Sequence, residues 1–151
     1  MPRTTKATTV KKTLEKCYLD FLGDEGYRPR ADPDTDDLDF SVITFKSEGS
    51  TFLLFVYEDD PDYFNVGFSL DLGEPAKDPA ALASLALDVS GQVKGVKCTL
   101  GLEDNAIRFQ VETFLCGSKV SHALLKRSLD ALRHAAAAFF ETRAPPEHLD
   151  A

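Results

Sequence analysis

The chain has 151 residues, a hydrophobic fraction of 43% and a formal net charge of −8 from 17 basic and 25 acidic residues. A chain of this length is predicted to form one globular domain that buries roughly 70% of the surface of its unfolded state. Its negative charge repels phosphate backbones and anionic headgroups, so we expect neither nucleic acid nor membrane as a main partner. The sequence has no signal-peptide pattern and no apolar run of transmembrane length, which predicts a cytoplasmic protein.

The first predicted element is an amphipathic helix that ends at Gly23. Its apolar positions recur at helical spacing and are Val10, Leu14, Cys17, Tyr18, Phe21 and Leu22. Thr8 or Thr9 is the expected N-cap, and residues 1–8 are expected to form a flexible basic arm. The basic side chains at this end are interpreted as a frayed, solvated helix start, and they are Arg3, Lys6, Lys11 and Lys12.

The stretch "RADPDTDDLDF" at 30–40 resembles a calcium loop, because Asp32, Asp34 and Asp36 fit the first three ligand positions. The template then requires Gly at the sixth position and a bidentate Glu at the twelfth, where this chain has Asp37 and Ile43. We therefore predict no metal site, and we interpret the stretch as a solvated connection between a helix and a strand.

Two strand-like runs follow, "FSVITFK" and "TFLLFVYE", and Glu48-Gly49 between them suits a two-residue hairpin turn. A third strand alternates from Phe64 to Leu72 and presents Asn65 and Gly67 to a polar face. A helix capped by Asp78 with Pro79 at its first position comes next. A second hairpin and a long amphipathic helix complete the order α-βββ-α-ββ-α, which predicts an α+β domain over residues 9–143 with a five-stranded antiparallel sheet. Residues 144–151 are expected to form a flexible tail.

The turn at Glu48-Gly49 fixes the predicted register of the first hairpin and sorts its side chains onto two faces. One face carries Ile43, Phe45, Phe52, Leu54 and Val56, and the other carries Phe40, Val42, Leu53, Phe55 and Tyr57. Both faces are apolar, which leaves two interpretations open. Helices cover one side of the sheet and the second set of residues is left for a partner, or the hairpin is central and covered on both faces.

Catalytic and redox candidates are few. Cys17, Cys98 and Cys116 are read as reduced thiols, and Cys17 and Cys98 as buried, because their spacing suggests neither a disulfide framework nor a metal knuckle. His134 stands one helical turn after Asp130, a pairing interpreted as surface stabilisation. The sequence contains no nucleophile elbow, phosphate loop, dinucleotide-binding turn or zinc-protease motif, so we expect no enzyme and no cofactor.

Several short segments of the chain resemble the YbjN-like family, whose fold is that of type III secretion chaperones. They are Gly26-Tyr27, "FKSEGSTFLLFVYEDDPDYF" at 45–64, "VKGVKC" at 93–98 and "VETFL" at 111–115. The resemblance runs from about Leu14 to Phe140. It implies a non-enzymatic, protein-binding domain, since secretion chaperones of this fold act as homodimers that hold an extended client segment.

The leading hypothesis is therefore a chaperone-like adaptor or regulator that binds a client protein or a second copy of itself. Its expected contact residues are Phe40, Val42, Leu53, Phe55 and Tyr57, beside an acidic rim that suits a basic, apolar segment. The competing hypothesis is a regulatory domain that senses a small ligand or a divalent cation.

Overall fold

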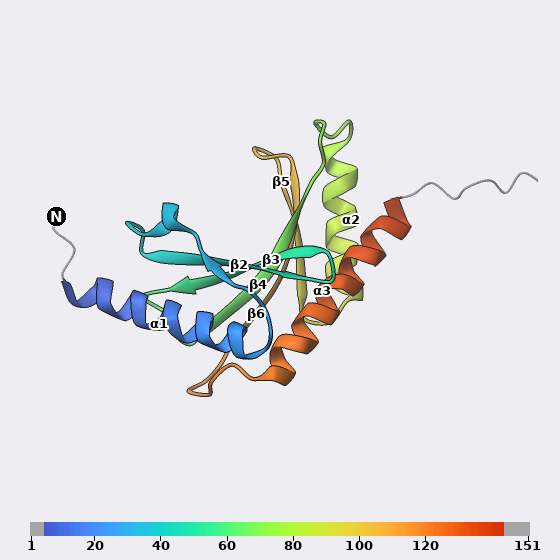
Figure 1. Ribbon diagram of the computed structural model, residues 1–151. Coiled ribbons are helices and arrows are strands. Elements are labelled where there is room, and N and C mark those ends of the chain that lie inside the picture. Colours follow the sequence, from blue (N-terminus) through green and yellow to red (C-terminus); the bar gives the residue numbers. More distant parts are fainter. Residues whose placement is uncertain (1–4, 144–151) are drawn as a thin grey trace, which may run out of the picture. The chain divides into compact units, whose positions relative to one another are not determined.

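The computed structural model describes residues 5–143, so positions 1–4 of the expected arm and the expected tail at 144–151 lie outside the described residues. The predicted α+β class is confirmed (Figure 1). The elements, in chain order, are α1 (Thr5–Asp24), β1 (Arg30–Ala31), the 3-10 helix η1 (Pro33–Thr35), β2 (Phe40–Ser47), β3 (Ser50–Tyr57), β4 (Tyr63–Asp71), α2 (Pro79–Gln92), β5 (Val96–Gly101), β6 (Ala106–Phe114) and α3 (His122–Arg143). The proposed caps Thr8 and Thr9 therefore lie inside α1.

The sheet is antiparallel and has six strands in the order β1-β2-β3-β4-β6-β5, so the prediction of five strands was one short. The additional strand is β1, whose two residues pair with Thr44 and Ile43 at the edge of β2. A strand of two residues shows no alternation of apolar and polar positions, and its sequence carries no period to detect.

The described residues form two compact units. The first contains the chain up to Val66 together with Glu112–Leu124, and the second contains Gly67–Val111 together with the described residues from Leu125 onward. The strands β4 and β6 contribute residues to both units.

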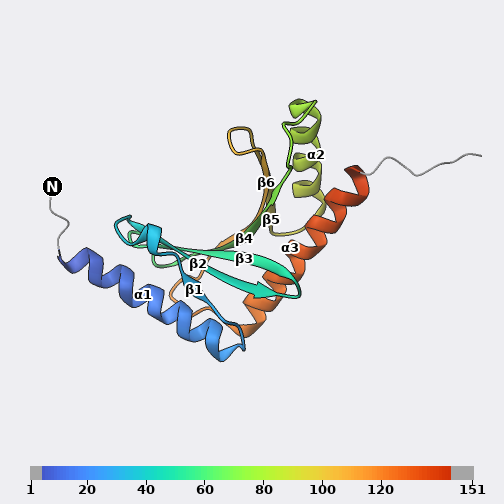
Figure 2. The same ribbon diagram turned by 45° about the horizontal axis from the view of Figure 1, so that its top comes forward.

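In the first unit, α1 lies along one face of β1, β2 and β3 (Figures 1 and 2). The predicted register of the hairpin is confirmed, from Ser47 opposite Ser50 to Phe40 opposite Tyr57. Glu48 and Gly49 both have positive φ, 49° and 82°, as a two-residue hairpin turn of this kind requires. The buried set of the hairpin, under α1, is Ile43, Phe45, Phe52, Leu54 and Val56.

The buried side of α1 differs from the predicted apolar stripe. The side chains buried there are Lys11, Glu15, Tyr18 and Leu22. Val10 is 42% exposed and Cys17 is also exposed, so the expectation that Cys17 is buried was wrong. Glu15 is tolerated because its carboxylate accepts a hydrogen bond of 2.6 Å from the hydroxyl of buried Ser41 on β2.

In the second unit, α2 and α3 lie on the same side of β5 and β6 in both ribbon views (Figures 1 and 2). Phe109 of β6 stacks on Phe68 and meets Phe139 of α3 edge to face. The predicted cap is confirmed, since the Asp78 carboxylate accepts from the Ala81 N–H with Pro79 at the first helical position. The Ser90 hydroxyl accepts a 2.8 Å hydrogen bond from the Cys98 N–H and so ties α2 to β5.

The polar face predicted for the third strand does not extend along all of β4, because Asn65 and Gly67 are buried. Gly67 approaches β6 so closely that an added Cβ would lie 2.2 Å from the Phe109 carbonyl oxygen. Only glycine fits at such a close backbone approach, and the alternation of the sequence does not reveal it.

Candidate functional site on the open face of the first hairpin

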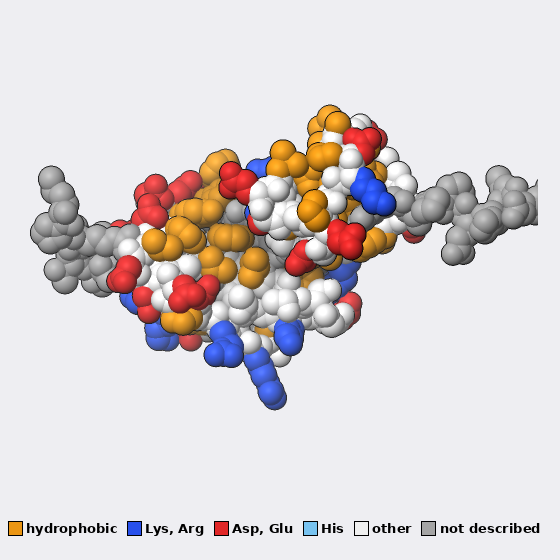
Figure 3. Space-filling model, turned by 90° about the horizontal axis from the view of Figure 1, so that it is seen from above, with side chains coloured by type: hydrophobic (Ala, Val, Ile, Leu, Met, Phe, Trp, Pro, Cys, Tyr) orange, Lys and Arg blue, Asp and Glu red, His pale blue; other side chains and the backbone are white. Residues whose placement is uncertain are grey.

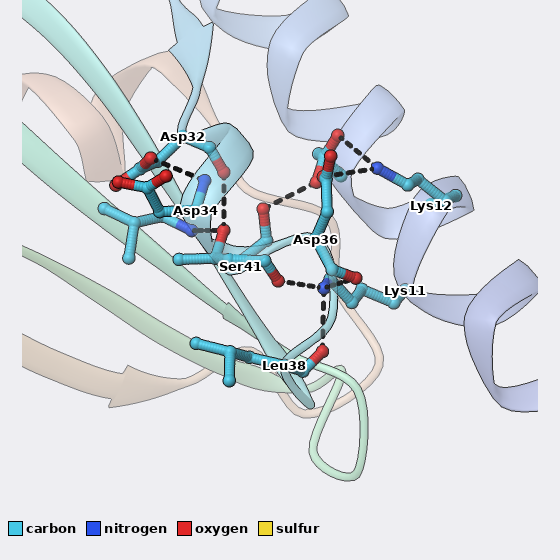
Figure 4. Close-up of polar contacts among 10 residues, drawn as sticks. Lys11, Lys12, Asp32, Asp34, Asp36, Leu38 and Ser41 are labelled. Atoms are coloured by element: carbon cyan, nitrogen blue, oxygen red, sulfur yellow. Dashed lines mark hydrogen bonds and ion pairs between the residues drawn. The ribbon is translucent and has the colours of Figure 1, made fainter. Parts of the chain in front are cut away.

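The acidic stretch at 30–40 does hold a cation, but the cation belongs to the chain itself. The Lys11 ammonium, on a side chain that is 1% exposed, donates to three backbone carbonyls of this loop (Figure 4). Its Nζ lies 2.5 Å from Thr35 O, 3.0 Å from Asp36 O and 2.7 Å from Leu38 O. The loop is therefore fastened to α1, and the interpretation of Lys11 as part of a solvated helix start was wrong.

The carboxylates that resembled calcium ligands have other roles. Asp32 caps η1 by accepting from the Asp34 N–H, and Asp36 forms a 2.9 Å ion pair with Lys12 (Figure 4). The Lys12 ammonium lowers the pKa of the Asp36 carboxyl. Within residues 5–143, no group of three or more His, Cys, Asp or Glu side chains is placed to hold a metal ion. The loop thus serves the fold, and the absence of a metal site stays a prediction.

The second face of the hairpin, opposite α1, is the candidate functional site. We call it the open face; its five predicted residues are all half-buried, and they are Phe40, Val42, Leu53, Phe55 and Tyr57. Each is paired across the strands with its neighbour in the predicted register, as Phe40 is with Tyr57 and Val42 with Phe55. Figure 3 shows hydrophobic side chains gathered over β2 and β3 on this side, with acidic side chains beside them. The structure brings the five residues together, and it does not test whether they bind a partner.

Two residues outside the predicted set, Tyr63 and Phe114, extend this face. Ring centroids follow one another from Phe40 to Tyr57 at 6.2 Å, from Tyr57 to Tyr63 at 5.6 Å and from Tyr63 to Phe114 at 5.7 Å. These four rings form an aromatic row that crosses β2, β3, β4 and β6. Phe114 is 62% exposed, so the row ends in an accessible apolar ring.

Carboxylates surround the middle of the aromatic row. Burial raises the pKa of Tyr57, and the negative charges of Glu112, Asp39 and Asp59 raise it further. Burial also raises the pKa of Tyr63, whose hydroxyl donates a hydrogen bond to the Glu112 carboxylate. Both phenols are therefore neutral at physiological pH, and the row consists of uncharged, mutually tilted rings in a negative field.

The other candidates from the sequence are not assembled into a site. Asp130 pairs with Lys126 at 3.2 Å and with Arg133 at 3.4 Å on the exposed face of α3. The surface partners of this carboxylate are therefore two other cations of α3, whereas the sequence suggested exposed His134 as its partner. His122 lies at the start of α3, exposed, and its Nδ1 contacts the Glu25 carboxylate. His148 lies outside the described residues.

Two further depressions lie in the first unit. One has a volume of about 510 Å³ and lies between α1 and the segment that leads into α3, with Leu14, Phe21, Leu115 and Val120 among its apolar lining residues. The other has a volume of about 440 Å³ and lies at the edge of β2, where Arg28, Arg30 and Lys46 line it. Leu14, Cys17 and Phe21 of the predicted apolar stripe of α1 line the first depression and are not fully buried.

The fold and the site together define an α+β protein with a helix-covered sheet whose first hairpin presents an aromatic surface. Compared with protein families, residues 19–143 match the YbjN family, described as "Putative bacterial sensory transduction regulator". The chain belongs to this family, as its resemblance indicated, and the family is described as a regulator and not as an enzyme. No curated protein and no solved structure matches the chain. No helix in residues 5–143 has the length and apolar character to cross a membrane.

Proposed function

We propose that this protein is a non-enzymatic regulator that binds an extended, basic and apolar segment of a client protein across the open face. The observation that supports this most directly is the aromatic row with its surrounding carboxylates. The family description agrees with a regulatory role and leaves the client open.

The chemistry of the surface favours cationic side chains. Arginine and lysine are attracted to the faces of aromatic rings, and this attraction increases where nearby carboxylates add a negative field. Alternate side chains of an extended segment are about 6.6 Å apart, close to the 5.6 to 6.2 Å between successive rings of the row. A segment laid along the row can therefore place alternate side chains on successive rings, while the intervening side chains point away from the open face.

The proposal is tested with two ten-residue peptides, one alternating Arg and Val and the other alternating Glu and Val. Calorimetry should show saturable binding of the Arg peptide, weakened by salt because the attraction is partly electrostatic, and no binding of the Glu peptide. Phe114→Ala should weaken binding of the Arg peptide about tenfold, as loss of an aromatic contact does. Phe140→Ala removes a ring that is 50% exposed on α3 and should leave binding unchanged, which makes it the matched control.

Leu53→Arg places a positive charge at the centre of the open face, which repels the Arg peptide and should abolish its binding while the protein stays folded. Equal binding of the two peptides, or equal effects of Phe114→Ala and Phe140→Ala, would contradict the proposal. Analytical ultracentrifugation tests the other possible occupant of the open face, a second copy of this chain. A wild-type dimer that Leu53→Arg converts to a monomer would assign the open face to self-association and not to a client.

A further inference from the structure

The depression at the edge of β2 differs in chemistry from the rest of this acidic protein. It has a volume of about 440 Å³ and we call it the basic pocket. Its polar lining residues are Arg28, Arg30, Lys46, Thr44 and Thr51, and the ring of Tyr27 contributes an apolar surface to the lining. None of the described residues that line it is acidic, although the chain has 25 acidic residues and a net charge of −8.

Strand pairing explains why these residues converge. Arg30 of β1 lies opposite Thr44 of β2, and Lys46 of β2 lies opposite Thr51 of β3, so each cation has a hydroxyl residue as its cross-strand neighbour. Because β1 pairs only with Ile43 and Thr44, the edge of β2 at Lys46 is not covered by β1. The basic pocket lies at this uncovered edge.

The segment that leads out of α1 supplies the remaining cation. Gly26 has φ +92°, a value that favours glycine, and the Tyr27 N–H donates to Leu22 O at 3.0 Å. This turn directs the chain from α1 towards the edge of β2, and Tyr27 packs on Phe45 with their ring centroids 5.1 Å apart. Arg28 is thereby held beside residues of β2 that are distant in sequence.

Within residues 5–143, the three cations of the basic pocket lack an acidic partner. In the described part of the chain, Arg28, Arg30 and Lys46 form no ion pair, whereas Lys12, Lys16 and Arg108 each do. Three like charges around one depression repel each other, and an anion bound among them would remove that repulsion. The two guanidinium groups are suited to planar, bidentate contacts with oxyanions.

We propose that the basic pocket binds the phosphate group of a small molecule. A phosphate monoester carries a charge of about −1.5 to −2 and three strong acceptor oxygens, which suits three cations and two hydroxyls better than one carboxylate does. The volume lies in the range of small-molecule sites, about 300 to 1,000 Å³. The net charge of −8 repels an extended polyanion, so the ligand is a small molecule. The ring of Tyr27, which lines the pocket, contacts the organic part of this ligand.

Calorimetry of the full chain with phenyl phosphate tests the proposal, with inorganic phosphate and benzoate as comparison ligands. Phenyl phosphate should bind saturably and at least tenfold more tightly than benzoate. The double variant Arg28→Gln/Arg30→Gln should weaken phenyl phosphate binding at least tenfold, and Arg127→Gln, an exposed arginine on α3, should leave it unchanged. Both arginines in the pocket are exposed, so the double variant should melt at the temperature of the wild-type protein, which circular dichroism checks.

Inorganic phosphate that binds as tightly as phenyl phosphate would assign the pocket to the phosphate group alone and overturn the role of Tyr27. Absence of binding, or equal losses in the double variant and in Arg127→Gln, would overturn the site itself. A single-stranded oligonucleotide that binds more tightly than phenyl phosphate would overturn the assignment to a small molecule. The Arg-Val peptide should bind the double variant and the wild-type protein equally, so this proposal can fail while the function proposed for the open face stands.

Discussion

Replacement of Lys11 by methionine tests whether the buried ammonium fastens the acidic loop to α1. Methionine is about as long as lysine and has an apolar side chain like the aliphatic part of lysine. It cannot donate a hydrogen bond, so three backbone carbonyls lose their donor. The bond to Thr35 O is buried, and leaving that acceptor without a donor costs about 1 to 3 kcal/mol. The other two bonds are only part-buried, and water can replace part of what they contribute.

The variant should therefore be destabilised by about 2 to 4 kcal/mol in urea unfolding, a large share of a total stability of about 5 to 15 kcal/mol. Its melting temperature should fall by about 10 °C, since each kcal/mol shifts a chain of this size by about 2 to 4 °C. Lys16→Met is the matched control, because Lys16 lies on the same helix and its pair with Asp20 is exposed, so no resolvable change is expected. A Lys11→Met protein as stable as Lys16→Met would refute the reasoning.

Three further predictions concern Gly67, Gly91 and Cys98 in the second unit. Gly67→Ala should destabilise the protein by about 2 kcal/mol or more, because the new Cβ collides with the backbone of Phe109. Gly91→Ala, where the new Cβ enters open space on α2, should instead stabilise the protein by about 0.5 to 1 kcal/mol. Urea unfolding that finds Gly67→Ala more stable than Gly91→Ala would be inconsistent with the structure. Burial raises the pKa of the Cys98 thiol to about 11, so a thiol reagent at pH 8 should modify the two exposed cysteines of the native protein and reach Cys98 only after unfolding. Because that pKa is above the 9.0 of an ordinary thiol, the stability that the neutral Cys98 thiol supplies is present below pH 9 and is lost as the pH rises towards 11; a Cys98→Ala variant should lack this part of the alkaline decline.

The first hairpin was predictable because the residues that determine its structure are adjacent in the sequence. A turn of Glu48 and Gly49 fixes the register, and the register then divides the flanking residues between two faces. Burial on one face by α1 follows from the amphipathic helix, although the helix turns a different side to the sheet than its apolar stripe indicates. Lys11 and Glu15 take buried positions because a serine hydroxyl and loop carbonyls, all distant in sequence, satisfy them.

The rest of the candidate site depends on which strands are neighbours in space. Tyr63 joins the aromatic row because β4 lies beside β3, and Phe114 joins it because β6 lies beside β4. The sequence pattern of a hairpin shows that two consecutive strands pair, but it does not show which other strands lie beside them in the sheet. The one available signal for Tyr63 was its position one residue before Phe64, which places it on the face opposite to the apolar alternation of that strand. The basic pocket was hidden for the same reason, because the acidic loop separates Arg30 from Lys46 in the sequence.

The most direct test of the proposed function is an NMR titration of the isotope-labelled chain with the alternating Arg and Val peptide. The proposal predicts that the largest chemical-shift changes fall on the aromatic row, Phe40, Tyr57, Tyr63 and Phe114, and on their neighbours Val42 and Phe55. Residues of α1 that line the separate depression, such as Leu14 and Phe21, should remain unchanged. Shifts concentrated on α1, or no shift on the aromatic row at saturating peptide, would contradict the assignment of the open face as the binding surface.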